Sequence, residues 1–254
     1  MNWLNEIIAR KRSDIAEMRA EEFRPRAERR DDFRDFQAAI RRRGRRVRVI
    51  AEAKSASPSA GVIAVNYDPV EIAMRYEKKG AAAISVLTDQ NYFGGRPEHL
   101  TAVGEAVALP ILRKDFIIDE RQILEAVAIG ADAILLIIAA LEPGQLRALH
   151  DCATANKLSV LVEVHRPEEI GIAVDAGAKI IGINNRNLAT LEVDLATTER
   201  LLPEIPNGIT IVSESGVRTA TDFTRMAALP VDALLVGEGL MRGEISIEPG
   251  ILPG

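Results

Sequence analysis

The sequence contains almost no cysteine and little histidine. Cys152 is its single cysteine, and His99, His150 and His165 are the only histidines among 254 residues. One cysteine forms neither an internal disulfide nor a thiolate metal cage, and no two histidines lie four residues apart, as helical zinc ligands would. We therefore expect no metal and no other cofactor, and a reducing cytoplasm as the setting.

Long apolar runs are also missing. The run Ala133–Leu141 is apolar but much shorter than the roughly 20 residues that cross a bilayer. The first residues, MNWLNEIIARKR, contain no apolar core followed by a small-residue cleavage site, so they do not match a secretory signal. We expect no association with membranes.

Positive charge is concentrated near the N-terminus. Residues 1–46 hold 14 Lys and Arg against 9 Asp and Glu, although the whole chain has a net charge of −5. The arginine-rich segment 41–46 resembles some nucleic-acid-binding stretches. No aromatic residue interleaves it and acidic residues surround it, so we expect a solvated helical face and no nucleic acid. A non-catalytic binding module is the rival interpretation, which a salt-dependent gel shift tests.

Aromatic residues make up only 4% of the chain, whereas hydrophobic residues make up 47%. The core must therefore consist of Ala, Val, Ile and Leu, which suits a sheet buried on both faces by helices. Apolar runs rich in β-branched residues, each bounded by Gly, Pro or charge, predict eight strands. They are Val47–Ala53, Ala82–Leu87, Pro110–Leu112, Ala133–Ile138, Ser159–Val164, Ile180–Ile183, Ile209–Val212 and Ala233–Val236.

A Gly-Ala joint recurs before several of these runs. Gly80, Gly130 and Gly177 each precede a predicted strand, at intervals of 50 and 47 residues. Glycine adopts the left-handed conformation that ends many helices, so each interval holds two strand–helix units of about 24 residues. Eight such units predict a (β/α)8 TIM barrel, and barrels of about 250 residues commonly form one domain. We expect residues 1–254 to form that single domain.

Residues 1–46 precede the first predicted strand and are predicted to form a helical N-terminal extension. Apolar residues from Trp3 to Met18 recur near helical spacing, and a second short helix is expected over Phe33–Ile40. We expect the extension to cap the catalytic end of the barrel. Later helices have start signals at Asp68-Pro69, Asp119–Gln122 and Thr219–Asp222.

Polar residues end most of the predicted strands, and in TIM barrels the chemistry lies at these ends. Glu52 and Lys54 share one face of the first strand, while Lys114, Glu163 and Asn184 hold corresponding positions on later strands. Opposite charges at a barrel mouth are costly unless they are paired or used. Lysines and carboxylates gathered there also shift one another's pKa values. We therefore predict a general acid–base site, without a metal, built from these five residues.

Three other polar residues near strand ends are given no catalytic role. Asp115 and Glu192 have the character of ordinary solvated or paired charges. His165 begins a loop, and we expect it to lie beside Glu163 rather than on the same face.

Two loops of small residues follow the last two predicted strands. Ser215-Gly216 precede a helix that opens at Thr219, and Gly237-Glu238-Gly239 precede a short turn. Small residues let backbone N–H groups approach an anion, and these two loops form the usual phosphate site of TIM barrels. We expect a phosphorylated small molecule to bind between them, with Ser57 nearby.

Six blocks of the sequence, taken together, resemble one enzyme family. They are Ile50–Ser59, Ser85–Asp89 with Tyr92-Phe93, Leu112–Phe116, Leu161–His165, Gly182–Leu188 and Ser213–Gly216. In this order and spacing they resemble indole-3-glycerol-phosphate synthases, and the resemblance extends from the N-terminal helices to Met241.

The resemblance implies a reaction of tryptophan biosynthesis. The family's substrate is 1-(2-carboxyphenylamino)-1-deoxyribulose 5-phosphate, in which the ring carbon bearing the carboxylate attacks the ribulose carbonyl. Carbon dioxide leaves next and water leaves last. By resemblance, Lys114 is the general acid at the carbonyl, Glu163 serves the dehydration, and Lys54, oriented by Glu52, holds the substrate's charged end.

The resemblance also implies the remaining substrate contacts. Asn184, Arg186 and Glu214 would complete the polar rim, and Pro58 and Phe93 would flank the anthranilate ring. The implied phosphate contacts are Ser57, Ser215, Gly216, Gly237 and Glu238, and the other implied contacts are Ser59 and Leu235.

Three positions depart from the family's pattern without removing a catalytic group. Ala60 stands where Lys is frequent, Gly239 where Ser is expected, and Ala53 where a larger aliphatic residue is usual. An engineered or reconstructed barrel with weak activity is the alternative. A phosphoribosylanthranilate isomerase is rejected because it needs a Cys–Asp pair, and Cys152 lies in a helical segment. The sequence is compatible with a monomer but does not determine the oligomeric state.

Overall fold

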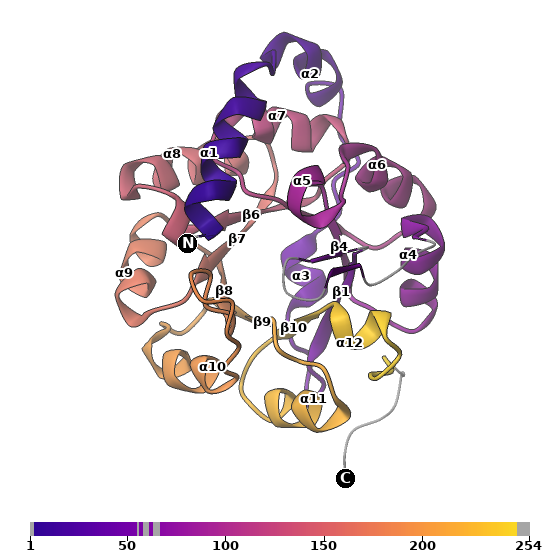
Figure 1. The fold of residues 1–254 in the computed structure, drawn as a ribbon, viewed down its shortest axis with the longest axis vertical. Helices are drawn as coiled ribbons and strands as arrows, with labels where there is room; N and C mark the ends of the chain where they lie inside the picture. The colour runs from indigo at the N-terminus through magenta and orange to yellow at the C-terminus, as the bar shows by residue number, and fades with distance from the viewer. Residues whose placement is uncertain (1–2, 55, 58–60, 63–66, 248–254) are drawn as a thin grey trace.

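The computed structural model describes residues 3–54, 56–57, 61–62 and 67–247, and its centre is a closed barrel of parallel strands (Figure 1). The barrel strands are β1 (Arg48–Ala53), β4 (Ala83–Leu87), β5 (Ile111–Lys114), β6 (Ala133–Ile137), β7 (Ser159–Val164), β8 (Ile180–Asn184), β9 (Thr210–Glu214) and β10 (Ala233–Val236). Their order around the ring is β1-β10-β9-β8-β7-β6-β5-β4. The predicted (β/α)8 barrel is therefore confirmed.

Several predicted strand ends were wrong by one or two residues. β5 starts at Ile111 rather than Pro110 and continues through Arg113 to Lys114, and β9 continues to Glu214. Apolar periodicity could not reveal these ends because their last residues are charged. A short antiparallel pair, β2 (Ala56–Ser57) with β3 (Gly61–Val62), follows β1 and was not predicted.

Side chains alternate along each strand between two cores. The inner core holds Ile50, Leu112, Leu161 and Val212, whereas neighbours such as Ala51 pack outward against the helices. Two residues further along, the same inward faces carry Glu52, Lys114, Glu163 and Glu214. The barrel interior is therefore apolar at one end and charged at the other.

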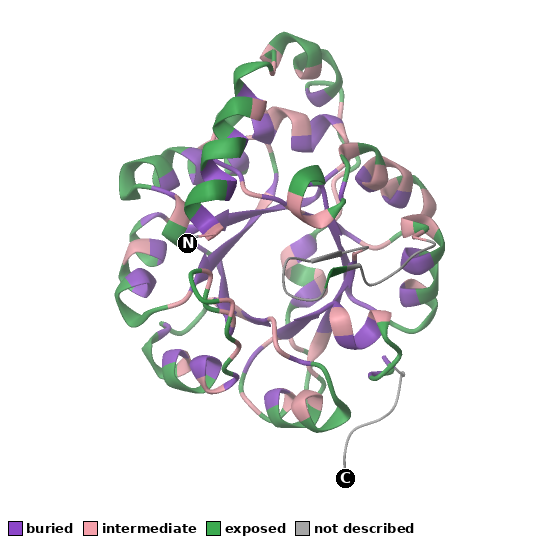
Figure 2. Ribbon diagram, in the orientation of Figure 1, coloured by how far each residue is buried: buried purple, intermediate pink, exposed green. Residues whose placement is uncertain are grey.

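Helices surround the strands and expose their outer faces (Figure 2). They are α4 (Pro69–Lys78), α5 (Gln90–Phe93), α6 (Pro97–Ala106), α7 (Glu120–Ala128), α8 (Pro143–Ala155), α9 (Pro167–Asp175), α10 (Ala196–Leu201), α11 (Ala220–Ala227) and α12 (Glu238–Met241), with 3-10 turns η1 (Ile138–Ala140) and η2 (Leu202–Glu204). Among the residues described, no helix combines the length and apolar character needed to cross a membrane.

The predicted helix boundaries have clear physical causes. Asp68 caps α4 by accepting from the backbone N–H of Val70 and Glu71. Capping boxes begin α7 at Asp119 and α11 at Thr219. Gly80, Gly130 and Gly177 have φ values of 88°, 99° and 93°, the left-handed conformation predicted for the helix-to-strand joints.

The N-terminal extension consists of α1 (Trp3–Ala16), α2 (Ala20–Ala27) and α3 (Phe36–Ile40). The prediction that all of it caps the catalytic end was wrong. α1 lies at that end, but Phe36 and Ile40 of α3 are fully buried in the inner core at the opposite end of the barrel. Gln37 of α3 bonds to groups at the starts of strands, the carbonyl of Lys179 and the hydroxyl of Thr210. α3 therefore plugs the end where the strands begin.

The segment 41–46 is not the helical face that we expected. α3 ends at Ile40, and an isolated antiparallel bridge joins Arg43 to Arg46. Arg42 donates to the carbonyls of Ala227, Leu229 and Val231. One arginine of the cluster thus ties the extension to the end of α11 and the start of β10.

Candidate active site

A cavity of about 140 Å³ opens at the carboxyl ends of the strands. Most of the predicted site residues contribute to its wall. The predicted residues that line it are Glu52, Lys54, Phe93, Lys114, Glu163, Asn184, Arg186, Glu214, Ser215, Gly216, Leu235, Gly237 and Glu238.

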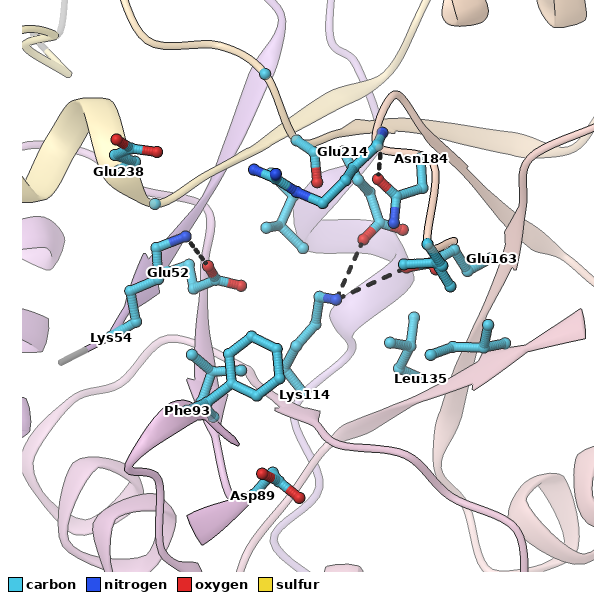
Figure 3. Close-up of a pocket in the computed structure, with 18 of the residues that line it drawn as sticks. Glu52, Lys54, Asp89, Phe93, Lys114, Leu135, Glu163, Asn184, Glu214 and Glu238 are labelled. Carbon is cyan, nitrogen blue, oxygen red and sulfur yellow. Dashed lines mark hydrogen bonds and ion pairs between the residues drawn. The ribbon is translucent and has the colours of Figure 1, made fainter. Parts of the chain in front are cut away.

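Lys114 occupies the middle of this site (Figure 3). Its Nζ lies 3.7 Å from a carboxylate oxygen of Glu163 and 3.7 Å from one of Glu214. These distances allow attraction but are too long for good hydrogen bonds. Burial disfavours the charged amine, yet the negative charges of Glu163, Glu214 and Glu52 outweigh it and raise the pKa of Lys114. Lys114 therefore carries a proton at neutral pH.

Glu214 is the carboxyl with the most altered pKa in this cluster. Burial and the nearby charge of Glu163 raise its pKa to about 8, although Lys114 acts in the opposite direction. A side chain at Gly182, on the neighbouring strand β8, would overlap the Glu214 carboxyl group. The glycine therefore provides the space that this carboxyl fills, and the carboxyl is mostly protonated at pH 7.

Glu52 and Lys54 form a separate ion pair, with 3.0 Å between Nζ and Oε1. Burial opposes ionisation of Glu52, but Lys54 and then Lys114 outweigh it and lower the pKa of Glu52. A Cβ atom at Gly237 would lie 3.0 Å from Nζ of Lys54. The ammonium group therefore rests against the loop that follows β10.

Arg186 extends the polar rim beyond β8. Its backbone N–H donates to Oδ1 of Asn184 at 2.9 Å, and its guanidinium donates to the carbonyl of Leu191 at 2.9 Å. Burial and the positive charge of Arg218 lower the pKa of Arg186. Two guanidinium groups that repel each other create a position favourable to an anion.

The loop after β9 has an unusual backbone. Ser215 and Gly216 have φ values of 64° and 89°, and strained turns of this kind concentrate at functional sites. The Asn185 amide holds the turn by donating to the carbonyls of Glu214 and Ser215, each at 3.0 Å. Asn185 was not among the predicted site residues.

The loop after β10 explains one departure from the family's pattern. A Cβ atom at Gly239 would lie 2.6 Å from Cδ1 of Ile245 and 2.8 Å from the carbonyl oxygen of Arg218. The present packing therefore favours glycine there. Glu238 forms ion pairs with Arg218 at 3.5 Å and Arg242 at 3.2 Å, which neutralise its charge at the rim.

Helix α1 contributes a wall that the sequence did not assign to the site. Trp3, Leu4 and Ile7 line the cavity beside Phe93, whose ring centroid lies 6.2 Å from that of Phe116. The extension was expected to cap the catalytic end, and α1 lies there, but Trp3, Leu4 and Ile7 were not among the predicted site residues.

A buried ion cluster fastens α1 to the barrel. Nζ of Lys11 lies 2.9 Å from Asp89 and 2.7 Å from Asp115. Burial opposes ionisation of Asp115, but Arg113 and Lys11 outweigh it and lower its pKa to about 2. Asp115, which received no catalytic role, therefore forms the centre of a permanent ion pair.

The remaining sequence predictions have mixed outcomes. Ser57 belongs to β2, whereas Pro58, Ser59 and Ala60 lie outside the described residues. Glu192 is exposed and does not line the cavity. The expectation that His165 would not share a face with Glu163 was wrong, since residues two apart on an extended chain share a face. Its Nε2 lies 3.3 Å from Oε1 of Glu163.

Comparison with known proteins identifies one family. The family model described as indole-3-glycerol phosphate synthase matches residues 4–247. A relative of that name from Chlorobium luteolum is 50% identical over 246 residues, covering 94% of this chain and 93% of the relative. Another, from Leptothrix cholodnii, is 47% identical over 254 residues, covering 98% of this chain and 96% of the relative.

A solved structure supports the fold alone. The N-acetylmannosamine-6-phosphate 2-epimerase from Clostridium perfringens aligns with a TM-score of 0.60 at 14% identity, covering 84% of this chain and 94% of that one. The family model and the two relatives, which are 50% and 47% identical to this chain, match nearly its whole length. They show that this chain belongs to the indole-3-glycerol phosphate synthase family.

Proposed function

We propose that the rim cluster converts 1-(2-carboxyphenylamino)-1-deoxyribulose 5-phosphate to indole-3-glycerol phosphate. The observation that carries the proposal is the position of Lys114. Its ammonium group lies between Glu163 and Glu214 in a cavity that also opens onto the loops after β9 and β10. A proton donor, a base and an anion site are thus present in one cavity.

The two ends of the substrate suit different parts of the cavity. Its phosphate would bind at Ser215-Gly216 and Gly237-Glu238, where Lys54 supplies positive charge. Its aromatic ring would lie along the apolar wall that includes Phe93 and Leu235. Binding energy at these remote groups can hold the two reacting carbons together, which removes much of the entropy cost of ring closure.

Ring closure needs a proton at the ribulose carbonyl. The ring carbon that bears the carboxylate attacks the carbonyl carbon, and the carbonyl oxygen takes a proton from Lys114 to become a hydroxyl. The bond to the carboxylate then breaks, carbon dioxide leaves, and the electron pair returns to the ring. The raised pKa of Lys114 keeps the donor protonated before the attack.

Dehydration completes the indole. The hydroxyl leaves as water after it receives a proton, and a base removes a ring proton so that the double bond forms. Glu163 serves this acid–base step, and Asn184, Arg186 and Glu214 complete the polar rim around it. The relatives that match nearly the whole chain do not favour the alternative of a reconstructed barrel with weak activity. A cytoplasmic location is part of this proposal.

Single-turnover kinetics on the purified chain test the function. The unaltered chain should form the indole product, which is followed by its absorbance or fluorescence. Glu163→Gln should release carbon dioxide but stall before dehydration, because the amide keeps the shape of the carboxyl group and cannot shuttle a proton. Glu192→Gln, an exposed carboxylate, is the matched control and should behave as the unaltered chain. No indole product from the unaltered chain would refute the proposal.

A further inference from the structure

Glu163 has a second neighbour that the reaction scheme leaves unused. Its two carboxylate oxygens face different groups, with Oε2 3.7 Å from Nζ of Lys114 and Oε1 3.3 Å from Nε2 of His165. Neither oxygen has a hydrogen-bond partner within the described part of the chain, and neither ring nitrogen of His165 has one. The imidazole of His165 and the carboxylate of Glu163 thus lie close together, with most of both side chains shielded from solvent.

The imidazole is fixed from its other side by α9. Oε2 of Glu169 accepts a hydrogen bond from the backbone N–H of His165 at 2.6 Å and lies 3.7 Å from Nδ1 of the ring. Its other oxygen accepts from Arg166 at 3.0 Å. Glu169 is buried, and although burial opposes ionisation, its contacts with His165 and Arg166 lower its pKa to about 2. Glu169 is therefore a fixed negative charge behind the imidazole.

The charges around His165 form an alternating series. Glu163 faces it from β7 and Glu169 faces it from α9, while Lys114 of β5 lies beyond Glu163. Strand β8 has no ionisable residue, and η1, which contacts both β7 and α9, consists only of Ile and Ala. Burial lowers the pKa of His165, but Glu169 and then Glu163 outweigh it and raise the pKa.

We propose that His165 is a positioning residue for Glu163, and that Glu169 holds its imidazole in place. The imidazole keeps Oε1 of Glu163 in a fixed orientation as long as the ring carries its proton. This inference rests on the proposed function, because it assigns His165 to the step that Glu163 serves. It differs from a stabilising role, since it predicts an effect on dehydration alone.

The test compares His165→Gln, whose amide can reach the place of Nε2 but does not titrate, with His165→Leu. His165→Leu should slow dehydration about 10- to 100-fold, the size expected when a reacting group is misplaced by about 1 Å. The Michaelis constant and the release of carbon dioxide should stay within about twofold. His165→Gln should restore part of the rate but lose the alkaline limb of the pH profile of kcat, because the ring of His165 holds its proton at lower pH and loses it as the pH rises.

Two further variants show whether the effect passes through Glu163. In the Glu163→Gln background, His165→Leu should cause little additional loss, because residues that act as one unit are not additive. His150→Gln is the matched control, a histidine of similar burial on α8 that does not line the cavity. If His165→Leu does not fold, Glu169→Gln replaces it and should shift the same limb.

The outcomes separate this inference from the proposed function. The inference is overturned if the unaltered chain and Glu163→Gln behave as expected while both His165 variants keep the normal dehydration rate and pH profile. It is also overturned if ring closure and dehydration slow equally. An inactive unaltered chain would refute the proposed function, and with it the role of His165.

Discussion

The two ends of the barrel bury carboxylates in opposite ways. Where the strands begin, Asp132 is 1% exposed and both of its oxygens are fully engaged. It accepts from the backbone N–H groups of Ile111 and Arg34 at 2.9 and 3.1 Å, and it forms ion pairs with Arg30 and Arg34 at 2.6 and 3.1 Å. At this end, the buried carboxylate of Asp132 is therefore fully paired with cations and N–H donors.

Where the strands end, two buried carboxylates lack such partners, although Glu52 and Asp115 at the same end are paired. Glu163 and Glu214 are each 1% exposed, yet none of their oxygens has a hydrogen-bond partner among the residues described. Lys114 lies 3.7 Å from both carboxylates, and the ring of His165 lies 3.3 Å from Glu163. Buried polar groups without partners are unfavourable for folding. This comparison indicates that Asp132 stabilises the fold at one end of the barrel, whereas Glu163 and Glu214 at the other end remain free to exchange protons.

The largest expected effect comes from the cation of the reactive end. Lys114→Met keeps much of the side-chain volume but removes the proton donor. A positioned acid contributes about 10²–10⁴-fold to a rate, so turnover should fall by that order with little change in substrate affinity. Steady-state kinetics measure both, and Lys78→Met, on the exposed face of α4, is the control. Near-normal turnover would mean that Lys54 is the acid and that the rim is only a binding surface.

A change at the opposite end should affect folding and leave chemistry intact. Asp132→Asn breaks a buried ion cluster, which typically costs about 3–5 kcal/mol of unfolding free energy. Turnover per folded molecule should not change. Chemical denaturation measures the loss, with Asp151→Asn, whose side chain is 69% exposed, as the control. If the two variants were equally stable, the comparison between the ends would lose its basis.

A smaller effect is expected where the extension meets the reactive end. Lys11→Met removes the cation that joins α1 to Asp89 and Asp115, so the wall formed by Trp3, Leu4 and Ile7 should loosen. We expect the Michaelis constant to rise about tenfold, equivalent to 1.4 kcal/mol of binding, while kcat changes little. Arg10→Met, at an exposed position of α1, is the control and should leave both the Michaelis constant and kcat unchanged. A normal Michaelis constant for Lys11→Met would show that α1 is not part of the binding site.

Much of this fold was predictable from local patterns. Strands buried on both faces form continuous apolar runs, and caps such as Asp68 and Asp119 have recognisable spacing. The rim residues Glu52, Lys114 and Glu163 were predictable because strand alternation places them on the inward face.

Other features depend on contacts between distant parts of the chain. Lys11 meets its partner Asp115 across more than 100 residues, and no local pattern indicates such a pair. The position of Phe36 at the far end of the barrel is likewise a tertiary property, because an apolar stripe does not specify which surface it covers. His165 was different, since the alternation rule applied correctly would have placed it beside Glu163 on the inward face.

The most direct test of the difference between the two ends is the unfolding free energy of Glu214→Gln at pH 5.5 and pH 9. The pKa of Glu214 is raised from 4.5 to about 8 in the folded chain, so its ionisation lowers stability as the pH rises from about 4.5 through 8. The amide removes this loss. The variant should be more stable than the unaltered chain at pH 9, by at least about 1.4 kcal/mol, the equivalent of one pKa unit. The gain should be much smaller at pH 5.5, and turnover should fall. A variant that is less stable at both pH values would show that Glu214 supports the fold as Asp132 does, and would contradict the account.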